Sequence, residues 1–251
     1  MSNVRVIPVL LLRNAGLYKS LKFKDHKYVG DPINAIKIFN EKEADELVFL
    51  DITASVQQQE PNYSMLADIA SECFMPLCYG GGIRSIEQIE KILYSGVEKV
   101  SLNTAAIEIP GLVNTAAKKF GSSTIVISFD VKKSLFGGYA VYIKSGTKST
   151  KLSPVEFARM MENEGAGEIL LNSIDADGTM KGYDIELIKT VSDKVGIPVI
   201  ACGGAGSLDH MKAAVQVGAS AVAAGSFFVF QGKHRAVLIT YPERSAITSI
   251  K

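Results

Sequence analysis

The sequence predicts an α/β fold, a (β/α)8 TIM barrel built from two (β/α)4 half-barrels. Short apolar runs alternate with amphipathic stretches along the whole chain, which is typical of a parallel sheet made of βαβ units. The stretch Leu77–Ser85, L-C-Y-G-G-G-I-R-S, returns in similar form at Val199–Leu208, about half a chain length later. A chain of 251 residues has the usual length of one such barrel. We therefore expect residues 1–251 to form a single domain.

Each predicted strand opens one βα unit. Helix starts between the strands are marked by capping side chains, of which Asp31 and Ser153 are followed by proline, and Ser85, Asp184 and Ser207 precede amphipathic stretches. In chain order, the eight predicted strands are Val4–Leu11, Glu46–Asp51, Met75–Tyr79, Lys99–Leu102, Thr124–Asp130, Gly167–Asn172, Pro198–Cys202 and Ala219–Ala224.

Two connections are longer than a barrel needs, at residues 13–30 and 131–152. In the second, Gly137-Gly138 followed by Tyr139–Ile143 predicts a small hairpin. Loops that follow barrel strands surround the active site, so either connection could close over a substrate.

Composition excludes several classes of partner. The formal net charge is +1 and Lys and Arg form no block, which argues against nucleic acid and against a membrane surface. Cys73, Cys78 and Cys202 show no metal-ligand spacing, and we expect neither a metal nor another cofactor. The apolar run at residues 6–12 contains Pro8 and is too short for a signal peptide or a membrane span. We expect a cytoplasmic protein.

The two glycine-rich turns are candidate phosphate cradles. Glycine lets backbone N–H groups approach an anion, and the helix start beyond each turn favours negative charge. The first turn is Gly80-Gly81-Gly82 and the second begins at Gly203-Gly204, while Asn103-Thr104 and Gly225-Ser226 add donors from the next strands. The alternative is a tight turn without a ligand. Two copies at half-length spacing favour a ligand with two phosphate groups.

Four aspartates at or just past strand ends are candidate acid–base groups: Asp51, Asp130, Asp175 and Asp177. A carboxyl group there can be tuned by burial to exchange a proton near neutral pH. Each could instead cap a helix or join a loop salt bridge, an alternative that is weakest for Asp130 because it lies on an apolar strand. The three histidines are expected at the surface.

A second charged set lies at the opposite ends of the strands. Arg5, Glu46, Lys99 and Glu168 fall at or near four strand starts. They could be separate solvated charges, or they could converge on the barrel floor, the face formed by the amino-terminal ends of the strands, as a salt-bridged ring.

Several long motifs resemble one family. They are R-V-I-P at Arg5–Pro8, D-E-L-V-F-L-D-I-T-A-S at Asp45–Ser55, G-G-G-I-R-S, G-A-G-E-I-L-L at Gly165–Leu171, D-G-T-M-K-G-Y-D at Asp177–Asp184, and I-A-C-G-G-A-G. Together they are similar to the cyclase subunit of imidazole glycerol phosphate synthase, HisF, over nearly the whole chain to about Phe230.

This resemblance implies a barrel that receives ammonia from a glutaminase subunit, HisH-like, docked on its floor, and that binds a bisphosphorylated aminoimidazole precursor. The charged ring would admit ammonia, Lys19 would contact substrate and Asp130 would be catalytic. By motif, Gly82, Asn103 and Thr104 would hold one phosphate. The residues around the other phosphate would be Gly178, Thr179, Gly204, Gly225 and Ser226.

One position departs from the family pattern. The family's first strand ends C-L-D-V and its aspartate is catalytic, whereas this chain has Leu11 in that place, and leucine can neither give nor take a proton. Paralogues with this change are similar to proteins associated with bacterial surface-polysaccharide biosynthesis. There the resemblance implies ammonia supply for amidating a sugar or sugar phosphate, together with an ATP-dependent amidotransferase.

Three interpretations follow. The leading one is an ammonia-receiving subunit for sugar amidation. The second is a working cyclase of histidine biosynthesis in which Asp51 or Asp177 replaces the missing carboxylate. The third is a non-catalytic, phosphosugar-binding regulator of a glutaminase.

Overall fold

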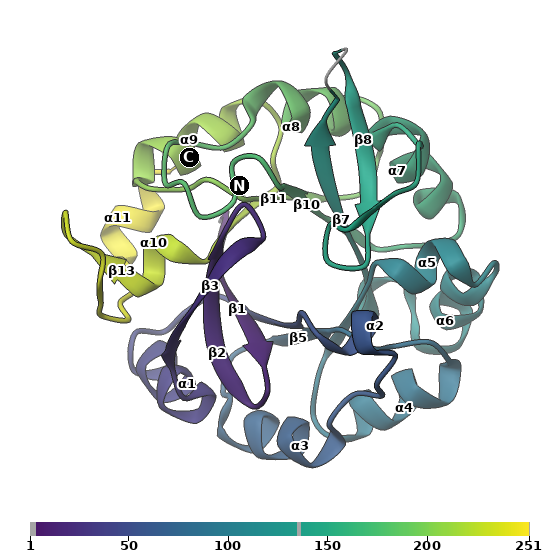
Figure 1. The fold of residues 1–251 in the computed structure, drawn as a ribbon, viewed down its shortest axis with the longest axis horizontal. Helices are drawn as coiled ribbons and strands as arrows, with labels where there is room; N and C mark the ends of the chain where they lie inside the picture. Colours follow the sequence, from purple (N-terminus) through teal and green to yellow (C-terminus); the bar gives the residue numbers. More distant parts are fainter. Residues whose placement is uncertain (1–3, 135–136, 251) are drawn as a thin grey trace.

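The structure is a computed structural model that describes residues 4–134 and 137–250. Eight parallel strands form a closed barrel, since the neighbours run from β10 through β11, β12, β1, β4, β5 and β6 to β7, and β7 pairs with β10 again. Figure 1 shows the strands at the centre and the helices around them. The strands are β1 (Arg5–Arg13), β4 (Leu47–Asp51), β5 (Leu77–Gly80), β6 (Lys99–Leu102), β7 (Ile125–Lys133), β10 (Glu168–Ser173), β11 (Val199–Cys202) and β12 (Ala221–Ala224).

The predicted barrel is confirmed, and each predicted strand overlaps one of these eight. The main differences are that β1 and β7 run on to Arg13 and Lys133, past the predicted ends. Both extensions pair with hairpin strands above the barrel rather than with barrel neighbours alone. We therefore find that two of the barrel strands continue into the loops that cover the mouth, the face formed by the carboxyl ends of the strands.

The helices begin where capping was predicted. Asp31 accepts from the N–H of Asn34 and Ser153 forms a capping box with Glu156; Ser85, Asp184 and Ser207 cap their helices as well. The longer helices are α1 (Pro32–Glu41), α3 (Tyr63–Glu72), α4 (Ile86–Tyr94), α6 (Leu112–Phe120), α7 (Pro154–Asn163), α8 (Ile185–Ser192) and α9 (Leu208–Gln216). The short ones are α2 (Ala54–Gln57), α5 (Thr104–Glu108), η1 (Ser122–Thr124), α10 (Ser226–Val229) and α11 (Arg244–Thr248).

Two hairpins rise over the mouth. The first, β2 (Gly16–Leu21) with β3 (Lys24–Gly30), was not predicted, because its turn residues Lys22 and Phe23 have positive φ without being glycine. The second contains β8 (Tyr139–Ile143), which pairs with the end of β7 on one side and with β9 (Lys148–Ser149) on the other. The β7–β8 pair confirms the small hairpin predicted there, and residues 135–136 of its turn lie outside the described residues. A third small hairpin joins β13 (Phe230–Gln231) to β14 (Ala236–Val237).

The core has two layers. Outward-facing strand residues pack with the helices in one large cluster. Inward-facing residues fill the barrel between floor and mouth, among them Ile7, Val48, Cys78, Val126 and Leu170. The barrel centre is therefore a packed interior rather than an open pore. Among the described helices, none has the length and apolar character needed to cross a membrane.

Candidate functional site

A cavity of about 370 Å³ opens at the mouth. Its lining comes from the ends of all eight barrel strands or the loops that follow them, and from the β2–β3 hairpin. Every candidate binding or catalytic residue named from the sequence lines it except Thr179 and Asp175: the lining includes Lys19, Asp51, Gly82, Asn103, Thr104, Asp130, Asp177, Gly178, Gly203, Gly204, Gly225 and Ser226.

Asp130 lies deep in this cavity between two amides. Asn103 donates from Nδ2 to Oδ2 and Asn172 donates from Nδ2 to Oδ1, each across 3.0 Å. Burial raises the pKa of Asp130 to about 7, and the nearby Asp177 adds to the rise, while the two amide hydrogen bonds oppose it. A carboxyl group in this state can accept or donate a proton near neutral pH.

Sequence reasoning did not single out Asn172. Its inward direction follows from strand alternation, because it lies four residues after Glu168 on the same strand, and both therefore face the barrel interior. The Oδ1 atoms of Asn172 and Asn103 are buried without a hydrogen-bond partner among the described residues. Both acceptors remain available to a ligand that carries N–H or O–H groups.

Lys19 reaches into the cavity from the β2–β3 hairpin. Only 4% of the residue is exposed, and Nζ donates to the carbonyl of Val9 on β1. Burial lowers the pKa of Lys19 to about 8, partly offset by the carboxylate of Asp177. Nζ also lies directly over Gly225, where a Cβ would come within 2.6 Å of it. Lys19 thus places a cation beside the predicted second phosphate position.

Asp177 anchors that hairpin. Its carboxylate accepts from Ser20 Oγ at 3.0 Å, and its carbonyl accepts from the N–H of Lys22 at 3.0 Å. Burial raises the pKa of Asp177, which Ser20 and Lys19 oppose. Gly178 is needed next to it, because its φ is +70° and a Cβ there would collide with the Ser20 carbonyl. The hairpin is therefore held down on the mouth by residues 177 and 178.

Asp51 has a local structural role. Its Oδ1 accepts from the N–H and Oγ1 of Thr53, both at 2.8 Å, and from the N–H of Ala54 at 3.0 Å. This oxygen therefore stabilises the turn that leads into α2, whose N-cap residue is Thr53. Asp175 accepts from the N–H of Lys133 at 2.9 Å and, with Thr179, lines a separate open cavity of about 770 Å³ at the outer rim.

The two glycine turns lie four strands apart in the ring of eight, on opposite sides of the mouth. At the first turn, Gly82 donates its N–H to Ser55 Oγ at 3.3 Å. The turn between β8 and β9 covers it, since the N–H of Lys144 donates to Thr104 Oγ1 at 3.0 Å and Ser145 Oγ donates to the Ile52 carbonyl at 2.8 Å. At the second turn, the N–H of Gly182 donates to the Gly204 carbonyl at 2.8 Å.

The two hairpins meet above the cavity. A Cβ on Gly146 would lie 2.7 Å from the ring of Phe23. The two hairpins therefore cover the cavity from opposite sides. The β2–β3 hairpin is held by Asp177, and the turn between β8 and β9 is bonded to Thr104 beside the first glycine turn.

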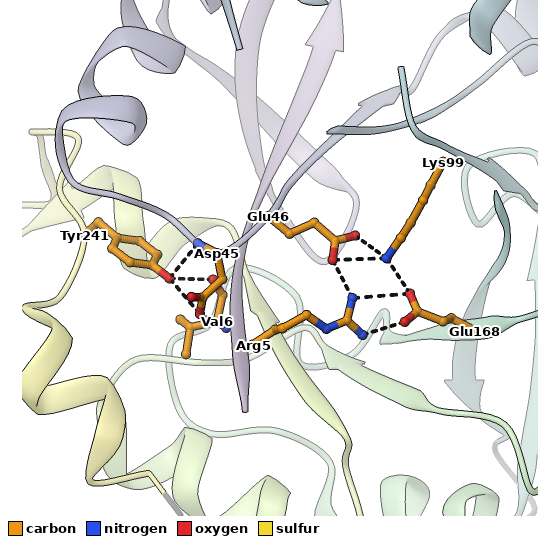
Figure 2. Close-up of polar contacts among 7 residues, drawn as sticks. All are labelled: Arg5, Val6, Asp45, Glu46, Lys99, Glu168 and Tyr241. Atoms are coloured by element: carbon orange, nitrogen blue, oxygen red, sulfur yellow. Dashed lines mark hydrogen bonds and ion pairs between the residues drawn. The ribbon is translucent and has the colours of Figure 1, made fainter. Parts of the chain in front are cut away.

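At the floor, the four predicted charges converge (Figure 2). Arg5 pairs with Glu46 and, at 2.6 Å, with Glu168; Lys99 pairs with Glu46 at 3.1 Å and Glu168 at 3.0 Å. Burial lowers the pKa of Arg5 and Lys99, but the two carboxylates outweigh this and raise both. The charges form a closed ring of alternating sign, which we call the charged ring.

Leu11 lies at the mouth. It lines the cavity together with Leu50 and Cys202, and all three pack on the inner-barrel cluster. Leu11 on β1 and Leu50 on β4 thus give the first two barrel strands an apolar contribution to the wall. Asp130 lines the cavity from β7, on the opposite side of the barrel.

The described residues contain no group of three His, Cys, Asp or Glu side chains that could hold a metal ion. Of the histidines, His26 and His234 are exposed, and His26 lines the cavity from β3. His210 is half-buried and accepts from the N–H of Gly206 at 3.2 Å, so its surface assignment from the sequence was only partly right.

Comparison with known proteins gives a consistent result. A family model described as "Histidine biosynthesis protein" matches residues 5–235. The chain is 57% identical over 240 residues to a putative imidazole glycerol phosphate synthase subunit hisF2 of Pseudomonas aeruginosa, covering 95% of this chain and 96% of that one. It is 51% identical over 240 residues to a putative subunit HisF of Leptospira borgpetersenii, covering 95% and 94%. It is 44% identical over 227 residues to the subunit HisF of Streptomyces coelicolor, covering 90% of each.

Proposed function

Because the chain belongs to the histidine biosynthesis protein family, among the HisF subunits of imidazole glycerol phosphate synthase, we propose that it is the ammonia-receiving subunit of a glutamine amidotransferase of this type. A glutaminase subunit docks on the floor and ammonia enters at the charged ring. The acceptor at the mouth is a sugar or a sugar phosphate of surface-polysaccharide biosynthesis, amidated together with an ATP-dependent amidotransferase.

The observation that carries this proposal is the contrast between the two ends of the barrel. At the floor, Glu46 is 2% exposed and holds both cations of the ring. At the mouth, Leu11 lines the cavity at the position where the family resemblance implies a catalytic aspartate. A buried charged ring is costly unless every member is paired, so its presence supports a role in the passage of ammonia. Loss of an acid–base group typically lowers the reaction rate by about 10² to 10⁴, so Leu11 argues against the cyclase reaction.

Within this proposal, substrate binding falls to the groups at the mouth. The two glycine turns and the donors of Asn103, Thr104 and Ser226 hold the anionic groups of the acceptor. Lys19 adds a cation beside the second of these positions, and Asp130 exchanges a proton with the reacting nitrogen.

A working cyclase is the second candidate, and it is favoured by the relatives' names and by the titration of Asp130 near neutral pH. It requires another carboxylate in place of the missing one. Asp51 and Asp177 are the groups within the cavity that could serve, but the contacts described above engage Asp51 in the turn before α2 and Asp177 in the hairpin. These commitments weigh against the cyclase.

A direct test supplies purified protein with a high ammonium concentration and the bisphosphorylated aminoimidazole precursor, and measures imidazole glycerol phosphate. Ammonium bypasses the glutaminase, so only the barrel's chemistry is tested. We expect no product, with the precursor still bound. Turnover within about tenfold of an ordinary cyclase, less than the loss expected for a missing acid–base group, would establish the cyclase instead.

The passage role is tested in the complex with the glutaminase. We expect Lys99→Met to abolish glutamine-dependent transfer while leaving glutamine binding by the partner intact. Lys189→Met, which removes an exposed lysine on α8, is the matched control. If transfer survives in Lys99→Met, ammonia does not pass through the ring. If phosphosugar binding changes glutaminase turnover and no product forms on the barrel, the regulator is the correct description.

A further inference from the structure

Side chains hold the lower end of the seam between β1 and β4. The backbone pairing of these strands runs from Val9 with Val48 to Leu12 with Asp51. Nearer the floor, the N–H of Val6 donates to Asp45 Oδ2 at 2.9 Å, and its carbonyl accepts from the Tyr241 hydroxyl at 2.7 Å. Asp45 and Tyr241 thus satisfy backbone groups at a level where no β1–β4 pairing is present.

The two residues also bind each other. The N–H of Asp45 donates to the Tyr241 oxygen at 3.3 Å, and the hydroxyl lies 3.3 Å from Asp45 Oδ2. Figure 2 shows this group beside the charged ring, with Tyr241 reaching in from the C-terminal segment. We call Asp45 and Tyr241 the seam clamp.

The seam clamp holds the backbone of two ring members. Val6 follows Arg5 and Asp45 precedes Glu46, so the Arg5–Glu46 contact spans the same seam. A buried ion pair is favourable only when its geometry is good. The hydrogen bonds of the seam clamp therefore join the two backbone segments from which Arg5 and Glu46 project.

Tyr241 is itself fixed in place. It is 5% exposed, its ring stacks on Phe228 at 5.5 Å and 25°, and it meets Phe39 edge-on at 6.4 Å. Arg244, at the start of α11, pairs with Asp45 Oδ1 while remaining exposed to solvent. The C-terminal segment thus connects the surface of the molecule to the charged ring.

We propose that Asp45 and Tyr241 are positioning residues for the charged ring, holding β1 and the start of β4 at the separation that keeps Arg5 paired with Glu46. The inference rests on the proposed function only where the ring is taken as the ammonia entrance. Without the seam clamp, the Arg5–Glu46 contact loosens, and Lys99, which shares Glu46, becomes accessible.

The test measures N-acetylation of Lys99 by limiting acetic anhydride, quantified by mass spectrometry relative to the exposed Lys189. Lys99 has 17% of its side chain exposed and Lys189 has 60%. In Tyr241→Phe, which keeps the ring stacking, we expect the relative rate at Lys99 to rise about fivefold, the factor to which the net free energy of one hydrogen bond corresponds. Asp45→Asn should give a rise in the same direction.

Tyr183→Phe is the matched control. Tyr183 is 7% exposed and its hydroxyl donates to the Ala223 carbonyl at 2.9 Å, so this variant loses the same kind of bond away from the seam. An equal rise in both variants would mean general loosening and would overturn the proposal, as would an unchanged Lys99 in Tyr241→Phe. A rise in Tyr241→Phe alone, with ammonia transfer absent from the wild-type complex, would retain the positioning role and reject the ammonia function.

Discussion

Asn172 donates a hydrogen bond of 3.0 Å to Asp130 Oδ1, and it does so from the strand that lies beside β7 on the side opposite β6. Asn103, at the end of β6, holds the other oxygen at the same distance. Since an ionised carboxylate only accepts hydrogen bonds, both amides must turn their N–H groups toward it. Burial and these two amides therefore set the protonation state of Asp130 in opposite directions.

Removing one amide should raise the pKa of Asp130 further. In Asn172→Leu, we expect a rise of about one unit, because a hydrogen bond to a charged group contributes about 1.5–3 kcal/mol and one pKa unit corresponds to about 1.4 kcal/mol. Carbon-13 NMR titration of the aspartate carboxyl groups measures the shift. Asn114→Leu removes a half-buried amide that donates to the Glu164 carbonyl away from the cavity, and should leave Asp130 unchanged. Equal titration of Asp130 in wild type and Asn172→Leu would contradict the assignment.

The raised pKa of Asp130 should make folding stability depend on pH. Because burial raises this pKa from 3.8 to about 7, the folded state binds more protons than the unfolded state between these values, and stability falls as pH rises from about 4 to about 7. Asp130→Asn should lack this pH dependence. The free energy of unfolding of the variant, relative to that of wild type, should therefore increase by up to about 4 kcal/mol as the pH rises over that range. Urea denaturation at pH 4, 5.5, 7 and 8.5 measures the difference. A constant difference across this range would show that Asp130 titrates at its ordinary value.

The charged ring should be sensitive to the loss of one member. Glu46→Gln leaves two partly buried cations facing Glu168 alone, and we expect a loss of about 3 kcal/mol in unfolding free energy, as for other broken buried pairs. Asp193→Asn breaks an exposed pair with Lys189 and should cost less than about 1 kcal/mol. Chemical denaturation of both variants decides this. Similar small losses would mean that solvent screens the ring.

Replacing Gly178 should lower the free energy of unfolding by more than its positive φ alone would predict. Gly111 has a comparable φ of +77° with open space around it, whereas a Cβ on Gly178 would collide with the Ser20 carbonyl. We expect Gly178→Ala to cost about 1–3 kcal/mol more than Gly111→Ala, the usual cost of overpacking. Hydrogen exchange should show the Lys22 N–H losing protection in Gly178→Ala only. Retained protection would mean that the hairpin is held by other contacts.

Much of the fold could be predicted from the sequence because its signals are local. Neighbouring residues alone determine two of these signals. One is a strand of four to nine residues bounded by turns, and the other is an aspartate or serine three residues before a helical N–H. Asp31 and Ser153 illustrate this, since both cap the helices expected of them. The convergence of the charged ring was also accessible, because strand starts in a parallel barrel share one face.

What could not be predicted depends on contacts between distant segments. The β2–β3 hairpin turns at Lys22 and Phe23, which carry no turn signal, and is stabilised by Asp177 from the other half of the chain. The contacts of Asp51 Oδ1 with Thr53, in the turn before α2, likewise depend on how the folded chain places Thr53. Thr179 could not be placed from the sequence either. Its motif puts it next to Gly178, which lines the cavity at the mouth, but Thr179 itself lines the separate cavity at the outer rim.

Tyr241 and Val6 are separated by 235 positions in the chain, so their contact belongs to the most non-local class that a folding chain must form. Contacts of this kind form late, because the entropy of closing a long loop opposes them. During synthesis, the floor cannot be completed until Tyr241 has left the ribosome. The two ends of the described chain are therefore joined at the floor only after most of the barrel has been made, so the seam clamp also closes the fold.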